Sequence, residues 1–324
     1  MPTLFRARPV MLAVLVLAPA ASLAQPASPG LAAALRAARP GETLRLPAGE
    51  FFECGVVVQD GLVIEGAGMD ATVLSDQTCE GKAVLVIRGR GVVVRDLTLA
   101  RARVPDGNGA GIRAEGEDLT VERVRFDNNQ VGIMAGGMFR GRMNIRDSVF
   151  QRDGVTGGER PMAAILVQGG SLLRLERVRV EEGRGGAALI SDAEFTDIRG
   201  GAFLRPAAPR GATLQVSRGL RLEGAQLEAG LMPSGQLAAV LALGGAGPLT
   251  LQGNRMAGQG ALLLNWSGAT PSLANNQLER GAEYQSSAGS WRHWASTTLR
   301  GGYAAARRLA GRARNMVKQM LSLS

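Results

Sequence analysis

The sequence predicts a single all-β domain, a right-handed parallel β-helix made of stacked coils. Short β-rich phrases recur at intervals of about 22 to 30 residues, which is the period of a solenoid. The chain contains 45 glycines but only 4% aromatic residues, as expected for many tight bends around an aliphatic core. No long Pro/Ser-rich linker or charge block divides it, so the length of 324 residues favours one elongated domain.

Each repeated phrase carries an Arg, Asp or Glu near its middle and ends on an apolar residue. The phrase ends are Leu99, Phe126, Phe150, Val180, Leu227, Met256 and, in a weaker copy, Leu278. One interval, from 180 to 227, is about twice as long as the others. We expect residues 195–198 to fill it as a divergent coil.

A second short apolar segment precedes each phrase. These segments are residues 84–87, 111–114, 131–135, 164–167, 188–191, 239–243 and 262–264. Strands of this length cannot bury their faces alone, but stacked about 4.8 Å apart they enclose one continuous core. We therefore expect parallel register from about residue 41 to about residue 280, with the phrase ends Leu99, Phe126, Phe150 and Val180 in one internal column.

The N-terminal residues predict export. Arg6 and Arg8 precede the apolar run 11–18, and small residues lead to a cleavage position after Ala24, as in a signal peptide covering residues 1–24. The apolar run is shorter than the ~20 residues that span a bilayer. The mature protein, with its β-helix over residues 25–298, is thus expected to have no transmembrane segment and to be secreted or periplasmic.

Both ends of the predicted solenoid carry a candidate cover. Residues 31–38 form a short amphipathic segment stopped by Pro40 and Gly41, which predicts an N-terminal capping helix. Residues 299–324 predict a basic amphipathic helix with apolar residues at helical spacing. This C-terminal helix either closes the last coils or lies on a membrane or polyanion.

The two cysteines, Cys54 and Cys79, lie one repeat apart. This spacing places them on adjacent coils at a distance that a disulfide accepts, and an exported chain enters an oxidising compartment. We expect them to be bonded. A metal-binding or nucleophilic role is not indicated, since neither has a neighbouring His.

The segment 39–51 (RPGETLRLPAGEF) resembles the N-terminal entry of the pectate-lyase-like, right-handed β-helix superfamily. With the coils described above, the resemblance covers nearly the whole mature chain. It implies the fold, and it is compatible with pectate lyases, polygalacturonases, and alginate lyases or epimerases. The same superfamily includes non-enzymatic binding and adhesive proteins.

The segment 79–113 is similar to exported bacterial β-helix repeat proteins of uncharacterised activity. A later coil of those relatives reads Gly-His-x-x-Tyr. The corresponding residues here run from Gly186 to Ile190 (GAALI), so both the His and the Tyr are missing. This departure from the pattern weighs against a shared activity.

One polar group lies near a predicted groove. Alternation from the inward residues Ile112 and Ala114 points Arg113 and Glu115 outward, and Arg88 is expected beside Glu115 on the preceding coil. The candidate ligand-binding residues are Arg88, Arg103, Asp106, Asn108, Arg113 and Glu115. Arg113 is also the best candidate for a catalytic base. The alternative is an Arg–Glu ladder that only supports the loop.

Other chemistry has less support in the sequence. The paired-carboxylate cues of hydrolases are absent, and the single histidine, His293, lies outside the coils. Outward positions Met134, Leu166, Ile190 and Leu241 are apolar, which favours binding over reaction. Three aromatic residues could either stack on sugar rings or be buried, and these are Trp266, Trp291 and Trp294. Residues 128–129, 254 and 275–276 predict asparagine turns that could stack as a ladder.

Three functions remain open. The first is an exported module that binds polysaccharide or cell-envelope glycan without efficient catalysis, the second a lyase or epimerase of acidic polysaccharide, and the third a structural or adhesive solenoid. The net charge of +9 favours an acidic partner. Export weighs against nucleic acid. No cofactor is expected: no metal site is apparent, and Ca²⁺, which some uronate lyases use, lacks a clear set of ligands.

Overall fold

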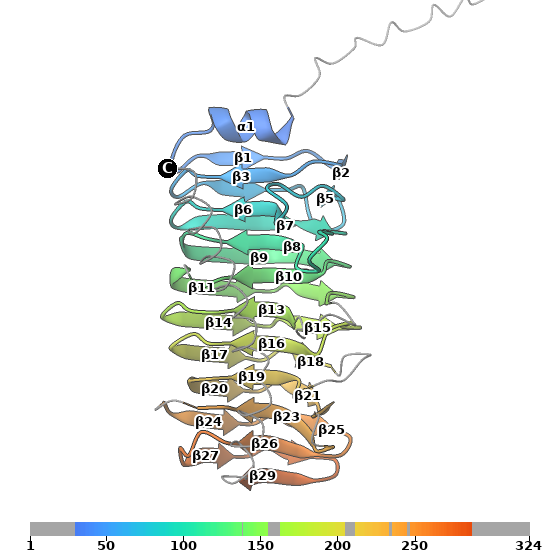
Figure 1. Cartoon of the computed structure of the whole chain (residues 1–324), viewed down its shortest axis with the longest axis vertical. Coiled ribbons are helices and arrows are strands. Elements are labelled where there is room, and N and C mark those ends of the chain that lie inside the picture. The colour runs from blue at the N-terminus through green and yellow to red at the C-terminus, as the bar shows by residue number, and fades with distance from the viewer. Residues whose placement is uncertain are drawn as a thin grey trace, which may run out of the picture.

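The computed structural model describes residues 30–137, 139–154, 163–204, 211–232, 235–244 and 247–286. Strands stack along one long axis, with the single described helix at one end (Figure 1). The predicted fold class, a right-handed parallel β-helix, is confirmed. The predicted signal peptide and the predicted C-terminal helix lie outside the described residues.

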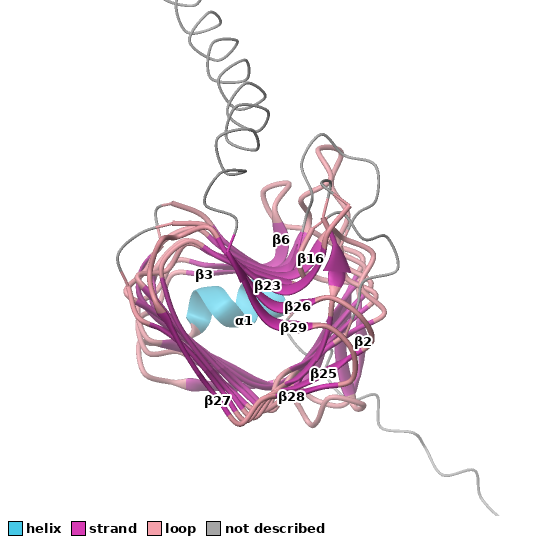
Figure 2. Cartoon of the chain, turned by 90° about the horizontal axis from the view of Figure 1, so that it is seen from below, coloured by secondary structure: helices cyan, strands magenta, loops and turns pink. Residues whose placement is uncertain are grey.

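Two sheets run the length of the solenoid. Sheet A has 18 strands among the described residues: β1 (Thr43–Arg45), β2 (Gly49–Phe51), β4 (Val63–Glu65), β5 (Thr72–Ser75), β7 (Val92–Ala100), β9 (Glu117–Asp127), β11 (Arg140–Arg146), β12 (Val149–Gln151), β14 (Leu172–Glu176), β15 (Arg179–Glu181), β17 (Phe195–Arg199), β18 (Ala202–Phe203), β20 (Gly219–Glu223), β21 (Gln226–Glu228), β24 (Leu249–Gln252), β25 (Arg255–Ala257), β27 (Pro271–Ala274) and β28 (Gln277–Leu278). Seen along the axis, sheet A bends around the core opposite sheet B (Figure 2).

Sheet B has 11 strands in the described part of the chain: β3 (Gly55–Val57), β6 (Ala83–Ile87), β8 (Ala110–Ala114), β10 (Val131–Ala135), β13 (Ala163–Val167), β16 (Ala187–Ser191), β19 (Leu214–Val216), β22 (Gly230–Leu231), β23 (Leu237–Ala242), β26 (Ala261–Asn265) and β29 (Ala282–Ser286). All its pairings are parallel except β22 with β23. Each predicted second segment coincides with one of these strands, except that the segment 239–243 extends one residue past β23.

The phrase ends lie in one internal column, as predicted. Leu99 pairs in register with Phe126, Phe126 with Phe150, and Phe150 with Val180. The column continues through Phe203, Leu227, Met256 and Leu278, so residues 195–203 do fill the long interval. The rings of Phe126 and Phe150 stack with their centroids 4.5 Å apart.

The N-terminal cap is helix α1 (Leu31–Ala37), which lies across the end of the space between the sheets (Figure 2). Its Leu31 and Leu35 are buried against the first coil. Gly55 permits this contact, because a Cβ there would lie 2.4 Å from Leu35 Cδ1. Glu53 accepts a hydrogen bond from the Leu31 amide at the start of the helix.

The predicted disulfide is confirmed. Cys54 and Cys79 are bonded with their Cα atoms 5.4 Å apart. Cys54 precedes β3 and Cys79 precedes β6, so the bond joins the first two coils of sheet B next to the cap. Such bonds are typical of proteins that fold in an oxidising compartment.

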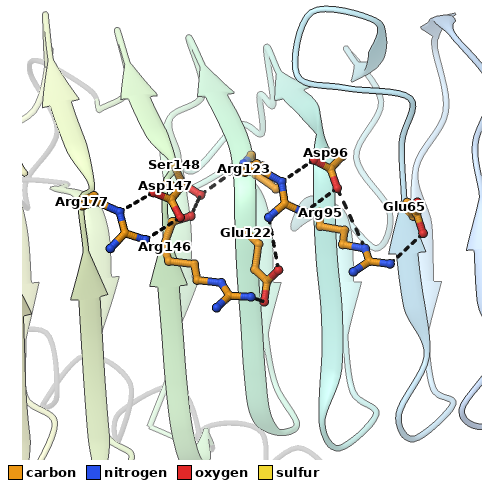
Figure 3. Close-up of polar contacts among 10 residues, drawn as sticks. Glu65, Arg95, Asp96, Glu122, Arg123, Arg146, Asp147, Ser148 and Arg177 are labelled. Carbon is orange, nitrogen blue, oxygen red and sulfur yellow. Dashed lines mark hydrogen bonds and ion pairs between the residues drawn. The ribbon is translucent and has the colours of Figure 1, made fainter.

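The middle of sheet A carries an alternating charge column. Successive coils place Arg45, Glu65, Arg95, Glu122, Arg146, Glu176, Arg199 and Glu223 in register, followed by the uncharged Gln252 and Ala274. Ion pairs join Arg95 to Glu65 at 2.9 Å and Arg146 to Glu122 at 2.6 Å (Figure 3). Like charges directly opposite one another destabilise a sheet, and the alternation avoids them.

From Arg95 onward, the residue after each member of this column turns the chain through a left-handed corner. From Asp96 onward the corner residues are Asp96, Arg123, Asp147, Arg177, Gly200, Gly224, Gly253 and Asn275, all with positive φ. The first four are ion-paired, with Arg123 on Asp96 and Arg177 on Asp147, both at 2.6 Å (Figure 3).

Candidate ligand-binding site

Arg88 and Glu115 meet outside sheet B, as predicted. Arg88 directly follows β6, and Glu115 directly follows the neighbouring β8. Because these strands are parallel and in register, the two side chains leave the sheet at the same edge, and Arg88 Nε donates to Glu115 Oε2 at 3.1 Å.

Sequence reasoning missed two further members of this group. Glu80 and Lys82 lie in the turn between the disulfide and β6, where Cys79 bridges to Ala83. Lys82 Nζ donates to Glu115 Oε1 at 2.8 Å and to Glu80 Oε2 at 3.2 Å, and Arg88 also donates to Glu80. We call Glu80, Lys82, Arg88 and Glu115 the salt-bridge cluster. The sequence feature that could have indicated Glu80 and Lys82 is the cysteine pair, because the disulfide fixes the turn that carries them.

The pKa values in the salt-bridge cluster move away from neutrality. The hydrogen bond to Glu115 raises the pKa of Lys82. The hydrogen bond from Arg88 lowers the pKa of Glu80. Burial raises the pKa of Glu115, but hydrogen bonds from Lys82 and Arg88 outweigh it and leave the pKa lowered. All three side chains therefore stay charged near neutral pH, which makes them poor proton donors or acceptors.

Arg113, in β8, is outward-facing as predicted, and its guanidinium has spare donors. Nη1 lies 2.7 Å from the Met134 sulfur, and the nearest carboxylate contact is Nε to Glu115 Oε1 at 3.9 Å. The Nε atom is buried and has no hydrogen-bond partner in the part of the chain that the structure describes. The side chain is 22% exposed, so the guanidinium is reachable from solvent yet largely desolvated.

Arg113 interrupts an apolar row on the outer face of sheet B. In register along the sheet lie Val56, Val86, Arg113, Met134, Leu166, Ile190, Gln215, Leu241 and Leu264. The predicted outward, apolar character of Met134, Leu166, Ile190 and Leu241 is confirmed. Leu166 and Leu241 are nevertheless buried, within two apolar clusters outside the main core.

The loop residues Asp106 and Asn108 do not join this group. They precede β8, whereas Glu115 follows it, and Asn108 Nδ2 donates to Asp106 Oδ2 at 3.3 Å. Within the described chain, no hydrogen bond or ion pair connects them to Arg113 or the salt-bridge cluster. The single polar group expected from the sequence is thus divided between the two ends of β8.

Arg103 lies on the loop side, at the edge where the chain passes from sheet A to sheet B. Its guanidinium donates to Ala102 O at 3.0 Å and to both the backbone and side-chain oxygens of Asn128. This placement separates Arg103 from Arg88 and Arg113, which lie at the other end of their strands.

Near the last coils, a cleft of about 910 Å³ is lined by residues that include Trp266 and Tyr284. Trp266 is only 7% exposed and packs with Met232 and Leu264, so its ring is mainly a core element there. Tyr284 is 39% exposed. Trp291, Trp294 and His293 lie outside the described residues.

Two short side-chain ladders are present where asparagine turns were predicted, and one of them consists of asparagines alone. Asn129 donates from its backbone and side chain to Asp153 Oδ1 at 2.8 and 3.1 Å. Asn254 makes the same two contacts with Asn276 Oδ1 at 3.0 and 2.9 Å. The first ladder thus carries an aspartate where the second carries an asparagine.

No group of three or more His, Cys, Asp or Glu side chains among the described residues is placed to hold a metal ion. No helix in the described part of the chain is long and apolar enough to cross a membrane.

No protein-family model matches the chain, and no curated protein matches it. Solved structures that it resembles include the ORF18 protein of Geobacillus virus E2, with 11% identity over 75% of this chain and 54% of that chain, at a TM-score of 0.41. The chain therefore spans about half of that viral protein.

Two other similar structures have carbohydrate-related names. A pectin methylesterase from Yersinia enterocolitica shows 12% identity over 77% of this chain and 90% of that chain, with a TM-score of 0.39. The A-module of a mannuronan C-5 epimerase from Azotobacter vinelandii shows 14% identity over 78% of this chain and 88% of that chain, with a TM-score of 0.41.

Proposed function

We propose that this protein is an exported β-helix module that binds an acidic polysaccharide or an anionic cell-envelope glycan without turning it over. The main observation in support is the environment of Arg113. Its guanidinium is largely desolvated, has no carboxylate contact closer than 3.9 Å among the described residues, and lies in a row that is mostly apolar. A uronate carboxylate would pair with the exposed part of the guanidinium through charge-assisted hydrogen bonds.

The neighbours of Arg113 support recognition of a sugar acid. Met134, which is partly exposed, lies beside it on the next coil, whereas Val86 on the preceding coil is buried. An apolar side chain beside a cation suits a uronate pyranose, whose C–H faces are apolar and whose carboxylate is charged. Arg88, in contrast, donates to two carboxylates, those of Glu80 and Glu115, so we assign it a supporting role.

Catalysis has less support than binding. A lyase or epimerase must remove the proton next to the uronate carboxylate, which needs a base with a pKa near the working pH. Lys82, Glu80 and Glu115 all have pKa values shifted away from neutrality. Arg113 would have to act as the base itself. We include no metal or other cofactor in the proposal.

The proposed site of action is the periplasm or the cell exterior, after signal-peptide cleavage following Ala24. The Cys54–Cys79 disulfide is consistent with such a compartment. Secretion would bring the protein into contact with envelope glycans, whereas nucleic acid is not proposed as a partner.

The test is binding of the mature protein to fluorescent oligogalacturonate, oligoalginate and neutral dextran at low salt. We expect the acidic glycans to bind, added salt to weaken binding, and Arg113→Gln to weaken it about tenfold. The matched control is Arg221→Gln, which removes the same charge from the outer face of β20, where Arg221 pairs with Glu223 at 3.6 Å.

Two results would overturn the proposal in different directions. Release of unsaturated uronate product, abolished by Arg113→Gln, would establish a lyase. Absence of binding to every glycan at low salt would favour a structural or adhesive solenoid.

A further inference from the structure

A second basic group lies at the edge where the chain passes from sheet A to sheet B. It contains Arg103 after β7, Asn128 after β9 and Arg184 after β15, which come from three different coils. Arg184 was not singled out by the sequence. Its backbone amide donates to Asp153 O at 2.8 Å, which holds its turn against the coil below.

The two guanidinium groups share one acceptor. Arg103 Nη2 donates to Asn128 Oδ1 at 2.7 Å, and Arg184 Nη1 donates to the same oxygen at 2.9 Å. The two nitrogens therefore lie no more than 5.6 Å apart. An amide oxygen carries only a partial negative charge, so it does not neutralise two full positive charges.

Among the described residues, neither arginine has a carboxylate partner. Within the described chain, neighbouring arginines are ion-paired, Arg101 with Asp76 at 2.7 Å and Arg152 with Asp127 at 2.6 Å, whereas Arg103 and Arg184 form no ion pair. Desolvation lowers the pKa of Arg103 and the charge of Arg184 lowers it further, while the charges of Asp153 and Asp76 act in the opposite direction. In the part of the chain that the structure describes, the pair thus has no carboxylate in direct contact.

The nearby buried carboxyl of Asp153 is not paired with either arginine. Asp153 is 1% exposed, and burial raises its pKa well above the usual range. Its Oδ1 accepts both hydrogen bonds from Asn129, and its Oδ2 has no hydrogen-bond partner among the described residues. Burial favours the protonated form of this carboxyl, and within the described chain no hydrogen bond or ion pair joins it to Arg103 or Arg184.

We propose that Arg103 and Arg184, held together by Asn128, form an oxyanion-binding site that takes a carboxylate or sulfate group of an acidic glycan. Two guanidinium groups that repel each other in the free protein are both stabilised when one oxyanion lies between them. Arginine suits this role because its planar donors match the oxygens of a carboxylate or sulfate. The choice of a glycan rests on the proposed function, whereas the anion site itself does not.

The direct test observes the arginine Nε–Hε resonances of the mature protein by two-dimensional NMR, assigned with the single variants. Galacturonate, inorganic sulfate and neutral galactose are added separately. We expect galacturonate or sulfate to shift both the Arg103 and Arg184 resonances, and galactose to leave them in place. Unchanged Arg103 and Arg184 resonances with both anions would overturn the site. The relative response to the two anions separates a carboxylate site from a sulfate site.

The second test uses the oligogalacturonate and a sulfated oligosaccharide with Arg103→Gln, Arg184→Gln and the control Arg221→Gln. Each of the first two variants should weaken binding of the preferred glycan about tenfold, and the control should change it little. Weakening by Arg113→Gln alone would overturn this inference and leave the proposed function intact. If no glycan binds while the free anions still shift Arg103 and Arg184, the proposed function fails and the anion site stands.

Discussion

The N-terminal and C-terminal coils turn the same left-handed corner with different residues. From Asp96 to Arg177 the corner is filled by alternating Asp and Arg, and from Gly200 to Gly253 it is filled by glycine. A non-glycine residue with this backbone costs about 1 to 2 kcal/mol, whereas glycine adopts it freely but loses more conformational entropy on folding. The ion pairs of the Asp and Arg corners offset part of the cost of their backbone conformation. The glycine corners do not carry that cost.

The neighbouring column also loses its charges along the chain, but two coils later than the corner. Alternating Arg and Glu continue from Arg45 to Glu223 and then give way to Gln252 and Ala274. The backbone pairing continues unchanged through this transition. The comparison therefore indicates that the core and the ladder of backbone hydrogen bonds set the coil, while corner charges adjust its stability.

The largest expected effect tests whether the two halves share one core. Phe150→Ala should lower the free energy of unfolding by about 3 to 5 kcal/mol, because it removes a buried ring stacked on Phe126. Met256→Ala, lower in the same column, should cost about 2 to 5 kcal/mol. Urea denaturation measures both, with the outward-facing Val149→Ala as the control. A cost below about 1 kcal/mol for Phe150→Ala would contradict a shared, well-packed column.

The internal column could be read from the sequence because apolar phrase ends recur once per coil. The charge alternation was also present, since the residue four positions before each phrase end reads Arg95, Glu122, Arg146 and Glu176. Sequence analysis noted a charged residue in each phrase but not its alternating sign. Aligning the phrases on their last apolar residue would have found it.

The Arg103–Arg184 pair could not be predicted in this way. The two residues are far apart in the sequence, and loops of unequal length bring them together around Asn128. Periodicity places strands well but does not place side chains on irregular turns. The same limit explains why Asp106 and Asn108, assigned to the Arg113 group, lie at the opposite end of β8.

The second prediction places a non-glycine residue at a glycine corner and a glycine at a charged corner. Gly224→Ala should cost about 1 to 2 kcal/mol, because φ is +66° there while a Cβ would meet no atom within 4 Å. Arg123→Ala keeps the unfavourable backbone and loses the ion pair with Asp96, so it should cost about 1 kcal/mol. Arg123→Gly loses the pair but relieves the backbone and should be close to neutral. Equal stabilities of Arg123→Ala and Arg123→Gly would show that the corner carries no strain.

The third prediction concerns the position at which the two ladders differ, which is Asp153 in the first and Asn276 in the second. Asp153→Asn gives the first ladder the same residue that Asn276 supplies in the second, and should stabilise the protein by about 1 kcal/mol near neutral pH. Because burial raises the pKa of Asp153, the folded state holds this proton more tightly than the unfolded state. The resulting stabilisation is present at low pH and is lost as the pH rises from the unfolded value through the folded pKa.

The gain from Asp153→Asn should therefore be greater at higher pH and disappear in acid. Urea denaturation of the variant and the wild type at several pH values measures it. A gain that is independent of pH would show that Asp153 does not carry a raised pKa.

The smallest effect is the response of the charged corners to acid. Hydrogen bonds from Arg123 and Arg177 lower the pKa of Asp96 and of Asp147, respectively, below the ordinary value of 3.8. Their stabilisation is present above that value and is lost as the pH falls through the folded pKa values. Asp147→Asn should lower the free energy of unfolding by at most about 1 kcal/mol near neutral pH. This loss should become smaller below about pH 4. A cost that persists unchanged in acid would mean that the ion pair is not its source.

The alternation also restricts how the number of coils can change by deletion. Removing one coil, residues 96–122, would bring Arg95 next to Arg146 and stack like charges, whereas removing two, residues 96–146, would bring Arg95 next to Glu176 and restore the alternation. Removing residues 224–252 would set Glu223 beside Ala274 and create no repulsion. The N-terminal half should therefore tolerate the loss of an even number of coils, which keeps opposite charges adjacent. The C-terminal half, where the column is uncharged, should tolerate the loss of any number.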